Sequence, residues 1–169
     1  MQLTIRRAKV DDLSAMYVIS LRAHQLLYAT LIPPDRRFDF DRRYTSSKES
    51  SEAYISRMVA RSKRPDWHMW VAESGGKIVG YTLEKRERAT FIQNRGLFVD
   101  PDYHGRGVGT KLFETSLKIA KLGDVIRLSV VKNNLRAKHL YEKHGFVVLG
   151  QDSKTFFGAT QEIMERTVD

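Results

Sequence analysis

The strongest pattern in the chain is the stretch Val99-Asp100-Pro101-Asp102-Tyr103-His104-Gly105-Arg106-Gly107-Val108-Gly109-Thr110-Lys111-Leu112. An extended run ends at its first residue, proline and aspartates predict a turn, and three alternating glycines lead into an amphipathic helix. Glycines let a backbone fold tightly and approach a ligand closely. The first N–H groups of a helix, together with its dipole, attract anions to the same point. The stretch therefore predicts a site for a pyrophosphate group.

Glycine-rich turns of this kind also occur in other structural contexts. The glycines alone are also compatible with a tight turn in which they only permit close packing. A dinucleotide-binding loop has the spacing G-x-G-x-x-G in the first strand–helix unit, whereas this spacing is G-x-G-x-G and lies past mid-chain. A Walker A loop contains Gly-Lys-Ser/Thr, and Gly109-Thr110-Lys111 reverses the last two residue types. Both of these rival phosphate loops are excluded.

A second block follows the predicted apolar strand Val125–Val131. It reads Asn134-Leu135-Arg136-Ala137-Lys138-His139-Leu140-Tyr141-Glu142-Lys143-His144-Gly145-Phe146. On a helix, the spacing i, i+3, i+4 places Ala137, Leu140 and Tyr141 on one face.

The two blocks together resemble the GNAT acetyltransferase superfamily. The residues from His104 to Gly109 match its coenzyme A loop, Gln/Arg-x-x-Gly-x-Gly/Ala, with His104 in the Gln/Arg position. The second block matches the pattern N-x-x-A-x-x-L-Y-x-x-x-G-F of that superfamily. The resemblance covers roughly residues 67–150 well and the N-terminal part only in general layout.

The resemblance implies an acetyl-CoA-dependent N-acetyltransferase, in which the primary amine of a small molecule, peptide or protein attacks the thioester directly. Backbone groups of residues 97–99 would pair with the pantetheine arm like an added strand and hold the developing oxyanion. Tyr141 is the predicted catalytic acid for the leaving thiolate. The implied cofactor-binding residues are Leu97, Phe98, Val99, His104, Gly105, Arg106, Gly107, Val108, Gly109, Thr110, Asn134, Ala137 and Tyr141.

No general base can be assigned from the sequence. Many relatives place a glutamate on the strand before the loop, but residues 90–96 contain no acid. Gln93 and Asn94 cannot take a proton, although they could order a water molecule. Glu84 and His24 are fallback candidates, but lone residues of this kind are more often surface or satisfied polar groups. Tyr141 could likewise be a packing residue of the core.

The predicted fold class is α+β (α/β mixed), in a single domain over residues 1–169. We expect one central, mixed, mostly antiparallel twisted sheet of about seven strands with helices on both faces. The expected elements are an extended segment near residues 3–8, a helix from Asp11 or Asp12 to about Leu27 ended by Pro33-Pro34, a helical region within residues 35–66, a hairpin of residues 67–73 and 77–85, a strand from 89 to 99, a helix from about 107 to 121, a strand from 125 to 131, a helix from Asn134 to Gly145, and strands near 146–150 and 161–167.

Composition excludes several other classes of protein. The chain has no cysteine, which rules out disulfides, a thiolate zinc site and a cysteine nucleophile, and no metal site is predicted. The N-terminus lacks the apolar run of a signal peptide. The longest apolar stretch, Leu26–Ile32, is far short of the roughly 18 residues of a membrane span. We expect a soluble, cytoplasmic protein with no membrane partner.

The formal net charge of +9 favours some polyanionic partner. The basic residues are scattered, and no recognition helix, stacking-aromatic pair or zinc pattern supports nucleic acid binding, which is therefore disfavoured. A catalytically weak sensor domain that binds acyl-CoA is the other alternative, since a strand carboxylate is missing. The cluster Arg36, Arg37, Arg42 and Arg43 could receive an acidic acceptor or be solvated. The sequence leaves open the acceptor, the acyl-chain preference, the physiological role and the oligomeric state, a homodimer included.

Overall fold

A computed structural model describes residues 2–36 and 51–169 of the chain. The elements in chain order are β1 (Thr4–Arg7), η1 (Val10–Asp12), α1 (Leu13–Leu31), η2 (Pro34–Arg36), α3 (Ser51–Ser62), β2 (Trp67–Ser74), β3 (Lys77–Arg88), β4 (Phe91–Val99), η3 (Pro101–Tyr103), α4 (Val108–Leu117), β5 (Val125–Val131), α5 (Leu135–Lys143), β6 (Val147–Phe156) and β7 (Ala159–Thr167). None of the described helices is both long and apolar enough to cross a membrane.

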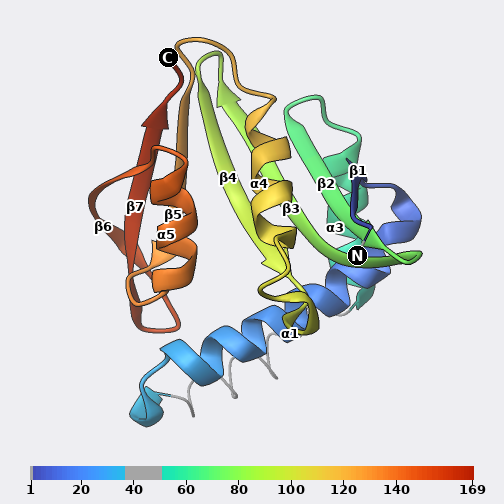
Figure 1. The fold of residues 1–169 in the computed structure, drawn as a ribbon, viewed down its shortest axis with the longest axis horizontal. Helices are drawn as coiled ribbons and strands as arrows, with labels where there is room; N and C mark the ends of the chain where they lie inside the picture. Colours follow the sequence, from blue (N-terminus) through green and yellow to red (C-terminus); the bar gives the residue numbers. More distant parts are fainter. Residues whose placement is uncertain (1, 37–50) are drawn as a thin grey trace.

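The described strands form one seven-stranded sheet in the order β1-β2-β3-β4-β5-β7-β6 (Figure 1). All neighbouring strands are antiparallel except β4 and β5, which are parallel. Helices α1 and α3 pack on one face of the sheet, and α4 and α5 pack on the other. The predicted mixed, mostly antiparallel sheet with helices on both faces is therefore confirmed.

Strands β4 and β5 are paired only where they begin. Phe91–Gln93 lie opposite Val125–Arg127, and no later register connects the two strands. Beyond these residues β4 pairs with β3 alone and β5 with β7 alone, and Figure 1 shows the two strands diverging. From Asn94 onward, the β5-facing edge of β4 therefore has no ladder partner in the described chain.

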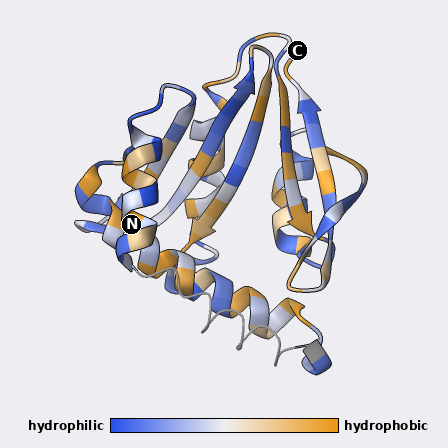
Figure 2. Ribbon diagram, turned by 180° about the vertical axis from the view of Figure 1, so that it is seen from behind, coloured by the Kyte–Doolittle hydropathy of each residue, from blue (hydrophilic) through white to orange (hydrophobic). Residues whose placement is uncertain are grey.

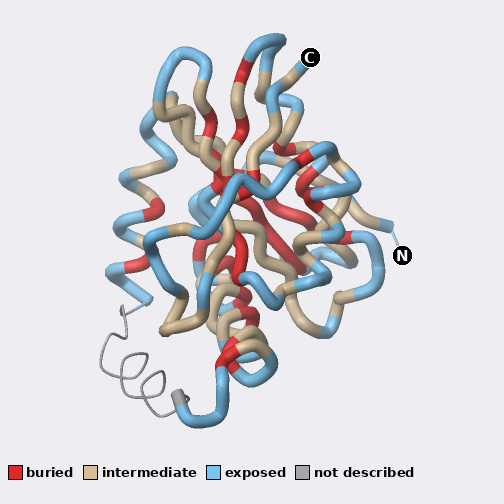
Figure 3. Tube along the Cα trace, turned by 90° about the vertical axis from the view of Figure 1, so that its left-hand side faces the viewer, coloured by how far each residue is buried: buried red, intermediate tan, exposed pale blue. Residues whose placement is uncertain are grey.

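The core follows the alternation of apolar and polar residues along the strands (Figure 2). Met16 and Met58 from α1 and α3 meet Val71 and Tyr81 on one face of the sheet. The opposite face is covered by two further clusters, formed by Ala72, Val79, Val108 and Leu112 under α4, and by Ile92, Phe113, Ile126, Leu128, Val130, Tyr141, Phe146 and Met164 under α4 and α5. Figure 3 shows these buried residues gathered within the sheet and on the inward sides of the helices.

The predicted helix bounds differ from the observed ones at several ends. Helix α1 runs to Leu31, a turn beyond Leu27, and stops where Ile32 becomes extended before Pro33. Helix α4 ends at Leu117 instead of near Lys121, because Asp124 accepts a hydrogen bond from the Lys121 N–H and draws the chain toward β5. The helical prediction within 35–66 is confirmed for α3, and its residues 37–50 lie outside the described part.

Strands β6 and β7 are longer than predicted and form a tight hairpin. Phe157 and Gly158, with φ of 48° and 81°, form its two-residue turn, a conformation that suits adjacent antiparallel strands. The sequence predicted β6 near residues 146–150, and the polar stretch after Gly150 shows no alternation of apolar and polar residues. The register shifts between Gln151 and Thr155 explain that lost alternation.

Candidate active site

The loop between β4 and α4 is shaped by an aspartate and two left-handed glycines. Asp100 accepts a hydrogen bond from the Asp102 N–H (3.0 Å) and pairs with Arg22 of α1 (2.7 Å). Gly105 and Gly107 have φ of 76° and 77°, a region that L side chains rarely adopt. Gly107 is the N-cap of α4 and offers no side chain to the first N–H groups of that helix. These groups are therefore available to an anion, as the sequence predicts.

Beside this loop lies a pocket of about 800 Å³, which we call the loop pocket. Its walls come from α1, the end of β4, the loop and α5. The predicted cofactor-binding residues that line it are Leu97, Phe98, Val99, His104, Gly105, Gly107, Val108, Gly109, Thr110, Asn134, Ala137 and Tyr141. Arg106 is not among its lining residues, because its side chain is exposed and its guanidinium lies 5.3 Å from the Tyr103 ring centroid.

Two polar residues of the loop pocket hold its backbone in place. The Nε2 of His104 lies 3.1 Å from the Val99 carbonyl, so the ring joins the loop to the end of β4. Burial, and then the charge of Arg136, lower the pKa of His104, which keeps the ring neutral. Asn134 caps α5, because its Oδ1 accepts a hydrogen bond from the Ala137 N–H at 3.2 Å.

Several lining residues were not predicted from the sequence. The C-terminal half of α1 covers one side of the loop pocket, and its contributions are Ala23, Leu26, Leu27, Thr30 and Leu31. The 3.6-residue periodicity of this helix indicates an apolar stripe, but not the element against which the stripe packs. Tyr103, Arg136 and His139 also line the pocket, and their positions next to the motif residues were the available signal.

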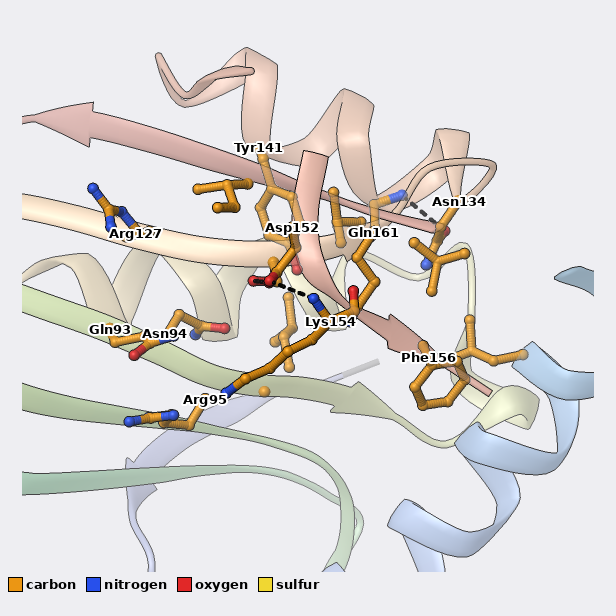
Figure 4. A pocket seen from close by; sticks show the side chains of 18 of the residues that line it. Gln93, Asn94, Arg95, Arg127, Asn134, Tyr141, Asp152, Lys154, Phe156 and Gln161 are labelled. Carbon is orange, nitrogen blue, oxygen red and sulfur yellow. Dashed lines mark hydrogen bonds between the residues drawn. The ribbon is translucent and has the colours of Figure 1, made fainter. Parts of the chain in front are cut away.

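A second pocket, about 560 Å³ in volume, lies where β4 and β5 diverge, and we call it the strand cleft (Figure 4). Its walls come from β4, β5, β6 and β7, with His24 and Leu27 of α1 at one end. The residues that it shares with the loop pocket are Leu27, Leu97, Phe98, Asn134, Ala137 and Tyr141. The two pockets therefore meet, and Tyr141 lies at their junction.

Tyr141 is buried where the two pockets meet. Its ring packs on Phe113 and Phe146, with centroids 5.1 and 6.2 Å away, so the side chain also belongs to the core. Burial raises the pKa of Tyr141 to about 12. The hydroxyl is consequently protonated at neutral pH, at a position that both pockets reach.

Of the two fallback bases, the structure brings only His24 to the strand cleft. Its ring lies between Phe98 and Phe156, with centroids 5.2 and 5.7 Å away. Burial lowers the pKa of His24, so the imidazole is neutral at pH 7 and can accept a proton. Gly96 makes this arrangement possible, because a Cβ there would lie 2.3 Å from the Phe98 ring.

Glu84 lies behind the strand cleft and does not line it. Its side chain is 2% exposed, and its Oε1 accepts hydrogen bonds from Thr82 Oγ1 (2.6 Å) and Asn94 Nδ2 (3.0 Å). Burial raises the pKa of Glu84 to about 7. Asn94 and Gln93 do line the cleft, as does Arg95, the extra residue of a β-bulge opposite Leu83 and Glu84.

Comparison with known proteins agrees with this architecture. A family model described as an acetyltransferase (GNAT) domain matches residues 65–148. An uncharacterized N-acetyltransferase of Methanocaldococcus jannaschii is 29% identical over 154 residues, which are 85% of this chain and 60% of that protein. The N-alpha-acetyltransferase RimI of Mycobacterium tuberculosis is 37% identical over 89 residues, 51% of this chain and 56% of RimI. The chain thus spans about 60% or less of the length of these relatives.

Solved structures share the fold along nearly the whole chain. The PaiA N-acetyltransferase of Thermoplasma acidophilum, crystallised in complex with coenzyme A, superimposes with a TM-score of 0.77. The match covers 99% of both chains at 23% sequence identity. The family model, the related sequences and this common fold show that the chain belongs to the GNAT superfamily of acetyltransferases.

Proposed function

We propose that residues 1–169 act as one acetyl-CoA-dependent N-acetyltransferase domain. The reaction moves an acetyl group directly to the primary amine of a small molecule, peptide or protein. One observation carries this proposal: the loop pocket and the strand cleft meet at Tyr141. Two substrates, one in each pocket, would have their reacting groups next to the same hydroxyl, as direct transfer requires.

The loop pocket fits the coenzyme. The uncapped N-terminus of α4 and the left-handed glycines Gly105 and Gly107 offer backbone N–H groups to a pyrophosphate. The unpaired edge of β4, over residues 97–99, offers further backbone groups to an extended arm. We assign to coenzyme binding the same residues that the sequence motifs indicate. Arg106 lies at the exposed rim of the loop pocket. The coenzyme A in the PaiA structure supports this assignment.

Two side chains near the junction of the loop pocket and the strand cleft, Tyr141 and His24, each carry out one proton transfer. Bound acetyl-CoA supplies an activated acetyl thioester. Tyr141 donates a proton to the sulfur as the C–S bond breaks, and His24 accepts a proton from the amine nitrogen as the N–C bond forms. A backbone N–H of residues 97–99 stabilises the negative charge on the carbonyl oxygen. Solvent then returns the proton to Tyr141 and removes the one on His24.

Thiol release from acetyl-CoA tests the proposal directly. The protein should release free coenzyme A with at least one class in a panel of amines, amino acids, antibiotics and peptides, and mass spectrometry should find one added acetyl group on that acceptor. Binding of acetyl-CoA without release on any of them would instead support a sensor domain. The observation that favours a sensor domain is that β4 contains no acid and has an asparagine at position 94.

A further inference from the structure

The charged side chains of the strand cleft come from three strands. Arg95 (β4), Arg127 (β5) and Lys154 (β6) are its cations, and Asp152 is an acid on the same wall. Glu87 pairs with Arg95, and Glu165 pairs with Arg127 at 2.6 Å. Ion pairs thus already compensate the two arginines.

Lys154 differs from both arginines in its partners. Among residues 2–36 and 51–169, no carboxylate forms an ion pair with its ammonium group. Asp152 is close in sequence, but its Oδ1 accepts a hydrogen bond from the backbone N–H of Lys154 (3.0 Å) and its Oδ2 accepts one from Ser129 Oγ (2.6 Å). Asp152 therefore shapes the backbone around Lys154 and forms no ion pair with its exposed side chain. The pKa of Asp152 is lowered first by the Ser129 hydroxyl, then by the Lys154 N–H, and only last by the charge of the Lys154 ammonium.

The position of Lys154 follows from an irregularity in β6. Gln151 lies opposite Glu162 and Thr155 lies opposite Thr160. Between these two paired positions β6 therefore contains more residues than β7, which makes a β-bulge in β6. The Gln161 side chain donates to the Lys154 carbonyl at 3.4 Å and holds this bulge against β7. In Figure 4 the Lys154 side chain extends from β6 across the strand cleft toward the β4 side. Its ammonium group therefore faces the space assigned to the acceptor.

The Lys154 side of the strand cleft would repel a cationic acceptor. A second positive charge on the acceptor would approach a lysine that has no ion-paired carboxylate, and the imidazole of His24 is neutral because burial lowers its pKa. A carboxylate at the same point gains a charge-assisted hydrogen bond from the exposed Lys154 ammonium. The charge pattern therefore selects for an anionic group at a fixed distance from the reacting amine.

We propose that the acceptor is a small amine that carries a carboxylate, such as a free amino acid, and that Lys154 binds this carboxylate while the amine faces Tyr141. The inference rests on the proposed function, since it names the acceptor class of that site. Lys154 thus determines specificity and takes no part in proton transfer.

The test compares each acid with its own amide. The twenty L-amino acids, β-alanine and 4-aminobutanoate, each with its carboxamide, are assayed by thiol release with wild type, Lys154→Gln and Lys154→Glu. Wild type should prefer the acid of at least one pair. Lys154→Gln should lower kcat/KM for that acid by about 10- to 100-fold and leave the value for its amide nearly unchanged. Lys154→Glu should prefer the amide.

Lys77→Gln provides the matched control, since Lys77 is an exposed lysine at the start of β3 that lines neither pocket. Its preference between acid and amide should equal that of wild type. Equal use of acid and amide by wild type, or equal losses on both in Lys154→Gln, would overturn the inference while transfer itself persists. Absence of thiol release with every amine, despite binding of acetyl-CoA, would refute the proposed function and the inference with it.

Discussion

Tyr141→Phe should lower kcat by about 10- to 100-fold and leave the affinity for acetyl-CoA nearly unchanged. The hydroxyl is proposed to act on the departing sulfur, an interaction made mainly in the transition state. The ring packing on Phe113 and Phe146 is retained in the variant. The measurement is kcat and KM for acetyl-CoA, with a melting curve to exclude misfolding. An unchanged kcat in a chemistry-limited assay would reduce Tyr141 to a packing residue.

Glu84→Gln should remove a pH dependence of stability. Because burial raises the Glu84 pKa from 4.5 to about 7, the folded state keeps a proton between these pH values that the unfolded state has lost. The free energy of unfolding of wild type therefore falls as pH rises through this window, by about 3 kcal/mol in total from this group. Below pH 4.5 and above pH 7 the contribution is constant.

Urea denaturation of wild type and Glu84→Gln at pH 4.5, 6 and 8 measures this effect. The stability of the glutamine variant relative to wild type should increase with pH, because the amide does not ionise and the other titrating groups are common to both proteins. Parallel pH profiles for the two proteins would show that Glu84 titrates like an ordinary exposed carboxyl group.

At the scale of single residues, the sequence could group only those proposed site residues that belong to local motifs. Asn134 and Tyr141 are seven residues apart on one helix, so their spacing alone places them together. His24 and Lys154 are 130 positions apart in sequence, and only the folded chain brings them to one pocket. The proposal of His24 over Glu84 as base likewise depends on the folded chain, because only His24 lines the strand cleft.

At the scale of elements, the N-terminus of α4 provides a test with an internal control. Gly107→Val should raise the Kd for coenzyme A by at least about 10-fold, since a β-branched side chain crowds the pyrophosphate and opposes φ of 77°. Gly76→Val in the β2–β3 turn has nearly the same strain, with φ of 74° and no atom within 4 Å of the added Cβ. Calorimetric titration compares the two variants with wild type.

Both variants should melt at a lower temperature than wild type, because both glycines occupy the left-handed region. Only Gly107→Val should also lose affinity. If Gly107→Val binds coenzyme A as tightly as Gly76→Val does, the backbone at position 107 does not approach the phosphates, and the loop assignment is wrong.

The sequence predicted the bounds of an element best where its apolar and polar residues follow a clear pattern. The hairpin of β2 and β3 has alternating residues and a Gly75-Gly76 turn, and β5 is rich in β-branched and other apolar residues apart from Arg127 and Ser129, so the sequence placed both closely. The bulged β6 follows neither pattern and was cut short. The divergence of β4 from β5, which creates the strand cleft, was not predicted, because it depends on pairing between distant segments.

At the scale of the whole molecule, acetyl-CoA should raise the melting temperature. A ligand that binds only the folded state stabilises it by RT ln(1 + [L]/Kd), about 2.7 kcal/mol at a concentration of 100 Kd. For a chain of 169 residues this corresponds to a shift of roughly 5–10 °C. The net charge of +9 complicates the comparison, since any polyanion gains some attraction to such a surface. ATP, which has phosphates but no pantetheine arm, is therefore the control ligand.

Salt separates the two contributions to this shift. Attraction between exposed charges weakens as the Debye length falls from about 10 Å at 0.1 M salt toward 3 Å at 1 M. Backbone contacts along β4 and apolar contacts with α1 in the loop pocket do not depend on screening in this way. The shift with acetyl-CoA should therefore persist at 0.5 M salt, whereas any shift with ATP should shrink. No shift at millimolar acetyl-CoA, or one that ATP matches at both salt concentrations, would mean that the loop pocket binds polyanions in general and that the coenzyme assignment is wrong.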